Sequence, residues 1–204
     1  MMKRIICLLA ALLMMGSWAS AEGWFPDWQN AATPTPGPET AGGFRFRGGV
    51  TWEMNPEAVR EKENGLQMEE RSQESWSVLY SVNRVEASRF FADLVYIFYN
   101  QKLQMILYAF DKAESKNSYL YLTGALSAVY GETHDAESAE VVGLMERVYP
   151  GMYTLEGISD VHAWQVSDGT RIYLYHQEGG SFSVLYAAPG TSLPENGVYI
   201  TNGL

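Results

Sequence analysis

Three runs of apolar residues in the middle of the chain give the first structural expectation. Each run is rich in aromatic and aliphatic residues and contains no Gly or Pro, a composition typical of β-strands. The runs span residues 76–82, 93–99 and 102–110. Asn100 and Gln101 separate the last two runs, so we expect a hairpin with a two-residue turn.

The expected register of this hairpin follows from its turn. The facing pairs would be Phe98 with Leu103, Tyr96 with Met105, and Leu94 with Leu107. Because side chains alternate between the two faces of a strand, this register collects six apolar side chains on one face. Lys102 and Gln104 would point to the other face. We interpret the apolar face as part of the core.

A short helix is predicted before these strands. Asn55 can cap it, Pro56 fits its first position, and Glu57 suits the positive end of the helix dipole. Asn64 and Gly65 end it after about two and a half turns, and so short a helix is stable only when it packs on something. Ala58 and Val59 would lie on the covered side near Trp52 and Met54, and Arg60, Glu61 and Glu63 in water.

Two further helices are predicted after the hairpin. The first shows apolar residues every three or four positions and ends at Gly131. The second, over residues 136–149, has acidic residues at its start and a basic residue near its end, as the helix dipole favours. The periodic positions of the first are Tyr119, Leu122, Thr123, Leu126 and Val129 or Tyr130. The end signals of the second are Asp135, Glu137 and Glu140, then Arg147 and Pro150-Gly151.

Strand patterns return near the C-terminus, over residues 162–166, 170–176 and 181–187. Asp168-Gly169 between the first two is a strong hairpin signal. The two halves of the chain then look alike, because each has a helix before a Trp-containing strand and a Tyr-rich hairpin. The similar segments are LVYIFYNQ at 94–101 with RIYLYHQE at 171–178, LYAF at 107–110 with LYAA at 185–188, and the strands of Trp76 and Trp164.

This likeness predicts a duplicated unit. Aligning Tyr96 with Tyr173 shifts the sequence by 77 residues, whereas aligning Tyr108 with Tyr186 shifts it by 78, so one strand needs an offset. The expected fold class is α+β, with two similar helix-plus-antiparallel-meander units packed together. The domain would cover residues 44–190, with halves of about 44–110 and 111–190, before a C-terminal tail at 191–204.

The residues before this domain read as processing and tether segments. Residues 1–21 have a basic start, an apolar run and a small-residue end, the order of a secretory signal peptide, so we expect cleavage after Ala21 and an exported protein, secreted or associated with the cell envelope. Cys7 lies at the wrong end of the apolar run for a lipoprotein signal. Residues 22–43 are rich in Pro and Thr and predict a disordered linker.

Charge and cysteine content narrow the functional classes. Loss of Lys3 and Arg4 with the signal peptide would change the formal net charge from −10 to −12, which repels phosphate backbones and disfavours nucleic-acid binding. Without Cys7 the mature chain has no disulfide, so a packed core must stabilise it. No membrane-spanning segment is predicted in that mature chain.

The segment Val-Thr-Trp-Glu-Met-Asn-Pro-Glu-Ala-Val, residues 50–59, resembles the Gly-Met-Ser/Thr-x-x-x-Val helix starts of SmpA/OmlA-like and β-lactamase-inhibitor-like domains. It is also similar to exported, uncharacterised bacterial proteins of the same build. The resemblance would cover about residues 44–189 and implies a short helix packed on one side of an antiparallel sheet. Glu53 replaces the usual Gly, Asn64-Gly65-Leu66 replaces Leu-Gly-x-Pro, and the paired cysteines of some inhibitors are missing.

The residues give little indication of chemistry. No pair among His134, His162 and His176 has the spacing that puts two ligands on one helix face, although His162 and His176 lie on neighbouring predicted strands. No serine, cysteine or metalloprotease motif occurs in the mature chain. Glu57 and Glu61 lie one turn apart on a solvated helix face. We therefore expect no catalytic residue, no metal site and no cofactor.

Aromatic residues leave one candidate binding surface. Tyrosine-rich sheet faces suit protein recognition, although aromatic residues on a sheet are more often core. The candidate residues are Trp164, Tyr173, Tyr175, Phe182 and Tyr186. The expected function is a non-enzymatic exported domain that holds a protein or an envelope component. The alternative is a small extracytoplasmic hydrolase whose carboxylates and histidines come from distant positions.

Overall fold

The computed structural model of the protein describes residues 46–73, 75–112, 115–146, 148–149 and 153–191. The predicted signal peptide, the predicted linker and all but Thr191 of the predicted C-terminal tail lie outside these residues. In the described part of the chain, no helix combines the length and the apolar character needed to cross a bilayer.

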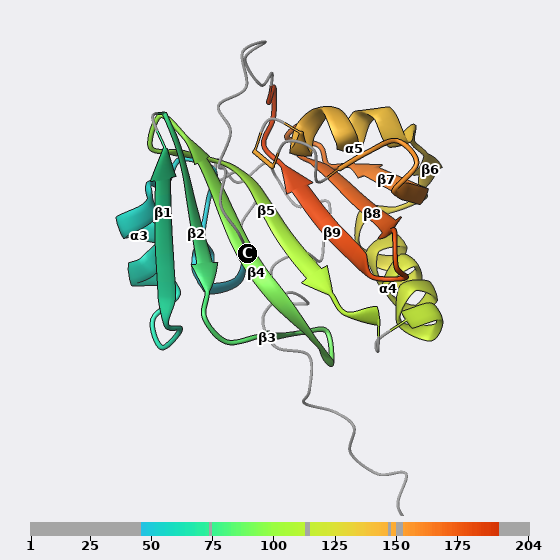
Figure 1. The fold of residues 1–204 in the computed structure, drawn as a ribbon, viewed down its shortest axis with the longest axis horizontal. Coiled ribbons are helices and arrows are strands. Elements are labelled where there is room, and N and C mark those ends of the chain that lie inside the picture. The colour runs from blue at the N-terminus through green and yellow to red at the C-terminus, as the bar shows by residue number, and fades with distance from the viewer. Residues whose placement is uncertain (1–45, 74, 113–114, 147, 150–152, 192–204) are drawn as a thin grey trace, which may run out of the picture.

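A single antiparallel sheet runs through the described residues in the order β1-β2-β4-β5-β9-β8-β7-β6 (Figure 1). Strand β3 pairs with the first residues of β4, which do not pair with β2. The expected mixed α+β class with an antiparallel sheet is confirmed. The strands are β1 (Met68–Gln73), β2 (Trp76–Ser81), β3 (Val85–Ala87), β4 (Phe90–Tyr99), β5 (Lys102–Phe110), β6 (His134–Asp135), β7 (Ile158–Gln165), β8 (Arg171–Gln177) and β9 (Phe182–Ala187). The helices are α3 (Pro56–Lys62), α4 (Ser115–Tyr130) and α5 (Ser138–Met145), with a 3-10 turn η1 (Arg47–Gly49).

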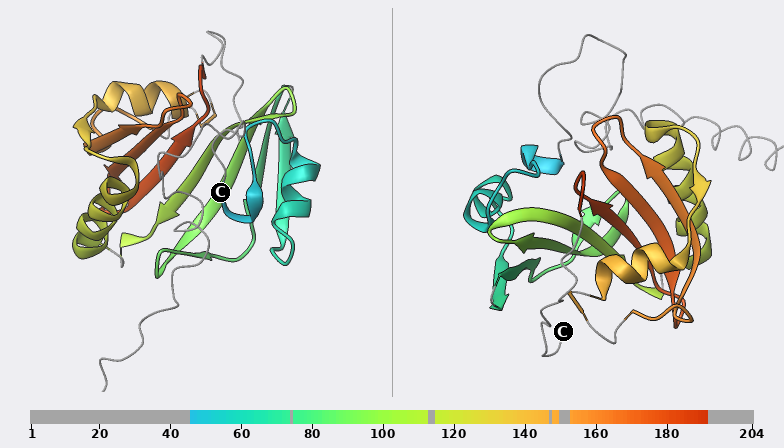
Figure 2. Two further views of the ribbon diagram at one scale, coloured as in Figure 1. Left: turned by 180° about the vertical axis from the view of Figure 1, so that it is seen from behind. Right: turned by 90° about the horizontal axis from the view of Figure 1, so that it is seen from above.

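The helices divide between the two faces of the sheet. Val59 of α3 packs in a cluster with Tyr96 and Ile106, and α4 packs in a neighbouring cluster that shares Tyr108 and Tyr186 with it. We call this side the α3–α4 face. Val141 and its neighbours in α5 pack on the other side, which we call the α5 face. Figures 1 and 2 show α3 beside the β1 end of the sheet, and α4 and α5 at the β7–β8 end.

The predicted short helix is confirmed. Asn55 caps it by accepting a hydrogen bond of 2.9 Å from the Ala58 amide, and Pro56 occupies the first turn. Val59 is fully buried. One detail was wrong: Glu63, expected in water, is buried beneath the end of the helix.

The central hairpin has the predicted turn, but most of its register was wrong. Asn100 and Gln101 have φ values of 48° and 64°, and Phe98 faces Leu103. A bulge then shifts the pairing between Ile97 and Phe98. As a result Tyr96 faces Ile106 instead of Met105, and Leu94 faces Tyr108 instead of Leu107. Met105 and Leu107 therefore pack on the α5 face.

The C-terminal elements follow the sequence pattern with changed limits. Helix α4 ends at Tyr130, before Gly131 with its φ of 90°, as predicted. Helix α5 (Ser138–Met145) is shorter than the predicted 136–149 at both ends, and Asp135, expected as a signal of the helix start, belongs to strand β6. Strand β7 begins four residues before the predicted start, and it contains a bulge between Ser159 and His162.

The hairpin predicted at Asp168-Gly169 is confirmed. Gly169 has a φ of 90°, and the Thr170 amide donates to Asp168 Oδ1 over 2.8 Å. The two strands that carry tryptophan have similar sequences, but their tryptophan side chains pack on different faces of the sheet. Trp76 packs on the α5 face, whereas Trp164 packs under α4. These tryptophans therefore do not occupy equivalent places in the two halves.

Candidate binding surface

The aromatic residues predicted as one binding face lie in the core, on both sides of the sheet. Tyr173 and Tyr175 are buried on the α5 face. Trp164 and Phe182 are buried under α4, and Tyr186 is half-buried between the α3 and α4 clusters. Because they are covered and point to opposite faces, they do not form one exposed aromatic surface.

Two of the histidines meet around Tyr119 of α4. The Tyr119 ring stacks on His176 with the centroids 4.0 Å apart, and its centroid lies 5.9 Å from that of His162. The Tyr119 hydroxyl donates to the Asp160 carbonyl. His134 pairs with Ala163 in β6 and β7, so it lies on the opposite side of the sheet from His162. These contacts pack the rings together and hold the N-terminal part of α4 on the sheet.

The His162 imidazole has one nearby carboxylate. Its Nδ1 lies 4.0 Å from Asp135 Oδ1, in the adjacent strand β6. In the described part of the chain, no three or more His, Cys, Asp or Glu side chains are arranged to hold a metal ion. The arrangement therefore supplies an imidazole with an acid beside it and no group of metal ligands among those residues.

A polar network lies inside the core beneath the end of α3. The Glu63 side chain, only 3% exposed, lies 3.2 Å from Arg47 Nε and accepts a hydrogen bond from the Tyr96 hydroxyl. Burial raises the pKa of Glu63, although the Tyr96 hydrogen bond and the Arg47 charge oppose it. Burial also raises the pKa of Tyr96 well above its ordinary value. The network joins η1 and the end of α3 to the centre of the sheet, and the covered carboxyl is closed to a substrate.

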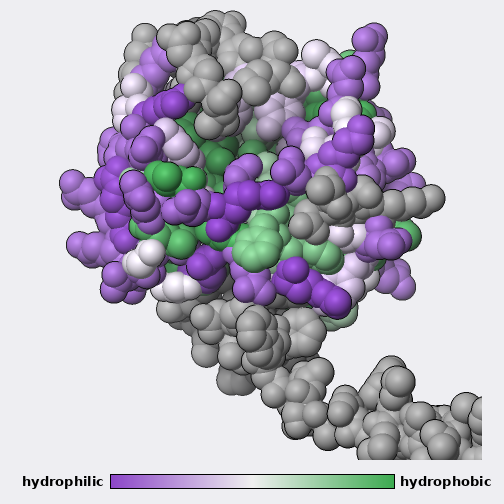
Figure 3. Space-filling model, turned by 60° about the horizontal axis from the view of Figure 1, so that its bottom comes forward, coloured by the Kyte–Doolittle hydropathy of each residue, from purple (hydrophilic) through white to green (hydrophobic). Residues whose placement is uncertain are grey.

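An exposed apolar surface lies at the end of the sheet near β3. Phe91 is 52% exposed and Val82 is 43% exposed, whereas most large apolar side chains around them are buried. Phe91 lies directly opposite Glu86 in the β3–β4 pair. Viewed from this end, apolar side chains gather in the middle of the molecule, with hydrophilic ones around them (Figure 3). We define the Phe91 surface as Val82, Arg84, Glu86, Phe91, Asp93 and Asp111.

The local backbone holds Phe91 in this position. Ser88 and Arg89 form the turn between β3 and β4 with φ values of 52° and 68°. Next to this turn, the Phe90 ring packs edge-on against the Tyr121 ring of α4, with the ring centroids 5.6 Å apart. The Arg89 guanidinium lies 5.1 Å from the centroid of the Tyr121 ring. Since successive residues of a strand point to opposite faces, anchoring Phe90 on α4 turns Phe91 to the α5 face.

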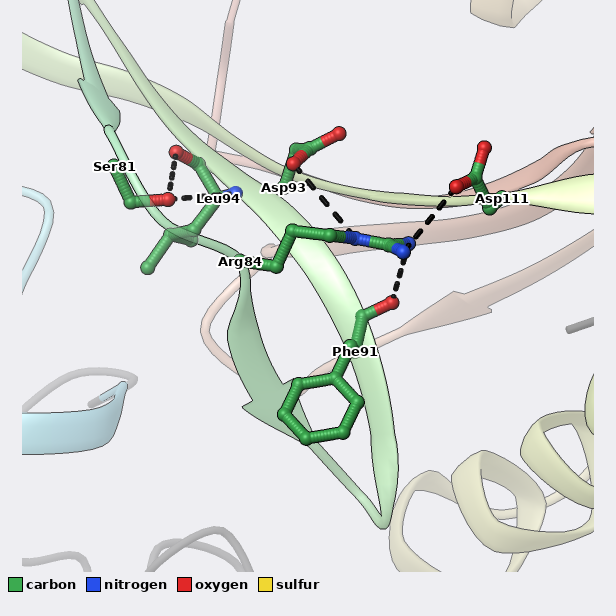
Figure 4. Close-up of polar contacts among 6 residues, drawn as sticks. All are labelled: Ser81, Arg84, Phe91, Asp93, Leu94 and Asp111. Carbon is green, nitrogen blue, oxygen red and sulfur yellow. Dashed lines mark hydrogen bonds and ion pairs between the residues drawn. The ribbon is translucent and has the colours of Figure 1, made fainter. Parts of the chain in front are cut away.

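The link from β2 to β3 is fixed in a similar way. The Ser81 hydroxyl bonds to both the amide and the carbonyl of Leu94, at 3.3 and 3.4 Å, where β2 ends (Figure 4). The chain can then leave β2 and continue as β3 beside the far part of β4. Val82 and Arg84 come from this link.

Arg84 crosses β4 and ties the surface together (Figure 4). Its guanidinium donates to the Phe91 carbonyl over 2.8 Å and to Asp111 over 3.2 Å, and its Nε lies 3.9 Å from Asp93. About a third of the Arg84 side chain is exposed, and both carboxylates are mostly exposed. The surface therefore presents an aromatic ring beside a guanidinium that two hydrogen bonds and a longer ion pair hold in place.

Comparison with models of known protein families, with characterised proteins and with solved structures finds no match to this chain. The resemblance to SmpA/OmlA-like and β-lactamase-inhibitor-like domains therefore stays a prediction.

Sequence reasoning missed the residues of this surface. The predicted strand began at residue 93, two residues after Phe91, so the ring was never assigned a face. The sequence did hold one signal: Phe91 and Asp93 are two residues apart, and residues two apart in a strand point to the same face. A phenylalanine in phase with an aspartate indicates an apolar side chain on a solvated face.

Proposed function

We propose that this chain is an exported, non-catalytic binding domain that holds a protein or an envelope component, and that it does so with the Phe91 surface. The observation that carries the proposal is a phenylalanine ring with 52% of its area exposed in a hairpin fixed by Arg84 and α4. Full burial of an exposed phenylalanine is worth about 1.5–3 kcal/mol, so covering the exposed half of Phe91 would contribute about half of that.

The composition of the surface supports recognition. Buried aromatic and Arg side chains dominate many protein interfaces, and side chains held in place before binding lose little freedom on complex formation. Phe91 and Arg84 are of these residue types. The Arg84 guanidinium is held before binding by hydrogen bonds to the Phe91 carbonyl and to Asp111, and the packing of Phe90 on α4 fixes the strand that carries Phe91. Export is supported by the signal-peptide pattern of residues 1–21.

The order of elements supports the duplicated unit as part of the proposal. In each half a helix precedes four strands of the main sheet path: α3 comes before β1, β2, β4 and β5, and α4 comes before β6, β7, β8 and β9. Among the described elements, strand β3 in the first half and helix α5 in the second have no counterpart in the other half. The two units meet at their last strands, where Leu107 faces Leu185. This pair fits the 78-residue shift of Tyr108 to Tyr186.

The test is capture of partners from the native envelope and culture medium with the wild-type chain and two variants. Phe91→Ala is expected to lose the partners that the wild-type chain retains. Leu120→Ala is the matched control, because Leu120 is 61% exposed and lies on α4, on the other face of the sheet. Equal recovery with Phe91→Ala and the wild type contradicts the proposed surface.

The hydrolase alternative is favoured by the approach of His162 to Asp135, at 4.0 Å. An imidazole that a carboxylate orients by a hydrogen bond is the base of many acyl-transfer sites, and Asp135 would have to move closer to His162 Nδ1 to make that bond. Hydrolysis of a model ester by the wild type, abolished in His162→Ala and retained in Phe91→Ala, would establish that alternative over the binding function.

A further inference from the structure

Carboxylates surround the exposed Phe91 ring on three sides. Glu86 lies directly across from it in β3. Asp111 follows Phe110, which faces Ala92 in the β4–β5 pair, so it comes to the other flank of Phe91. Asp93 lies two residues further along β4 on the same face. The apolar centre of the surface is therefore edged by negative charge.

Two of the nearby cations, Arg84 and Arg89, already have partners. Arg84 is held by Asp93 and Asp111. The Arg89 guanidinium lies over the Tyr121 ring of α4, away from Phe91. The Lys112 side chain lies close to Gly180. The carboxylates thus outnumber the one cation among the residues of the Phe91 surface.

We infer that the partner of the Phe91 surface is a protein segment in which basic side chains flank an apolar one. This inference rests on the proposed function and adds the chemistry of the partner. An apolar side chain would pack on Phe91 and Val82, and Lys or Arg side chains would reach Glu86 and Asp111. A cation near an aromatic face is attracted by the ring quadrupole as well as by neighbouring carboxylates.

Charge complementarity decides the class of partner. The whole chain carries a formal net charge of −10, so an acidic partner would be repelled during approach as well as at the surface. Phosphate backbones and anionic lipid head groups are disfavoured for the same reason. A free small cation would leave the exposed Phe91 and Val82 side chains uncovered. A basic protein segment with an apolar residue satisfies both parts of the surface.

The probes are three labelled peptides of equal length that alternate Leu with Lys, with Ser or with Glu. They are titrated against the full exported chain. The Lys peptide is expected to bind about tenfold or more tightly than the Ser peptide, and the Glu peptide to bind most weakly. Raising the salt concentration from about 0.05 to 0.3 M is expected to weaken binding of the Lys peptide, because ions screen exposed charges.

A matched pair of double variants separates the surface from the overall charge. Glu86→Gln/Asp111→Asn removes two charges at Phe91 and is expected to weaken binding of the Lys peptide about tenfold. Glu57→Gln/Glu61→Gln removes the same charge from α3, on the other face, and is expected to change binding by less than about twofold. Circular dichroism and a melting curve establish that each variant is folded.

The outcomes distinguish this inference from the proposed function. Equal affinities for the Lys and Ser peptides, or equal losses in the two double variants, overturn the basic partner. If Phe91→Ala still abolishes capture of the native partner in that case, the binding surface stands and only its charge preference fails. If Phe91→Ala leaves both capture and Lys-peptide binding unchanged, the proposed function fails as well.

Discussion

Glu63 is a titratable residue whose carboxyl group lies inside the core. It is held by Arg47 at 3.2 Å and by the Tyr96 hydroxyl, and it lies among apolar residues of the α3 cluster. Burial disfavours the charged form of a carboxyl, and here that effect exceeds the effects of the hydrogen bond and the cation. The stability of the protein should therefore depend on the protonation of this one group.

The pH dependence has a definite sign. The pKa of Glu63 is raised above its ordinary value of 4.5, so the folded state binds this proton more readily than the unfolded chain. The contribution to stability is complete below pH 4.5 and is lost as the pH rises through the raised pKa. Glu63→Gln removes the titration, so the free energy of unfolding of the wild type minus that of Glu63→Gln should fall over this pH range. Urea unfolding at a series of pH values measures it, and a constant difference contradicts the prediction.

A second buried contact joins Trp52, which precedes α3, to Thr170, the residue before β8. Trp52 Nε1 donates to Thr170 Oγ1 over 2.9 Å, and the Thr170 side chain is fully buried. Trp52→Phe should lower the free energy of unfolding by about 1–3 kcal/mol, because it leaves a buried hydroxyl without this donor. Thr170→Val should have a similar cost, and the double variant should cost less than the sum of the two. Additive costs in a double-mutant cycle of urea unfolding would show that this hydrogen bond does not couple the residues.

At the level of elements, the turn between β4 and β5 has a strained backbone that a substitution should relieve. Gln101 is exposed in the β4–β5 turn and has a φ of 64°, a backbone angle that residues other than glycine rarely adopt. Gln101→Gly should raise the free energy of unfolding by about 0.5–1 kcal/mol, because Asn-Gly is the preferred pair in such a turn. Gln101→Ala is the control and should give no gain. Thermal denaturation compares them, and equal melting temperatures in all three proteins would contradict the argument.

The sequence pattern predicted the long elements and missed those that depend on distant partners. Strand β5 was predicted with its observed limits, because most of its residues are apolar, it contains no Gly or Pro, and a turn precedes it. The hairpin register failed because Tyr96, Ile97, Met105 and Ile106 are all buried, so alternation does not distinguish the faces. Strand β1 was missed because its residues are mostly polar and, among the described strands, it pairs with β2 alone.

The candidate surface could be predicted only in part. The acidic character of the chain and the absence of a catalytic motif follow directly from the sequence. The exposure of Phe91 depends on Phe90 packing against Tyr121, which lies on a different element. The burial of Glu63 depends on Tyr96, 33 residues away in sequence. Such long-range contacts leave no local pattern, so they appear only once the sheet and helices are assembled.

For the whole molecule, the continuous sheet predicts that the two halves unfold together. Strands β5 and β9 pair along six residues, and the α3 and α4 clusters share Tyr108 and Tyr186. Separate units joined by a linker would unfold in two steps, whereas a shared core couples them. Unfolding followed by tryptophan fluorescence and by far-ultraviolet circular dichroism should therefore give coincident transitions.

Leu185 tests this coupling at the junction. It is fully buried on the α5 face and lies opposite Leu107 of the other half. Leu185→Ala should lower the free energy of unfolding by about 2–5 kcal/mol through the cavity it leaves, and the transition should move as a whole. Leu120→Ala, at an exposed position, should change it by less than about 0.5 kcal/mol. If Leu185→Ala instead splits the transition, so that one half melts while the other keeps its stability, the β5–β9 pair joins two independently folded units.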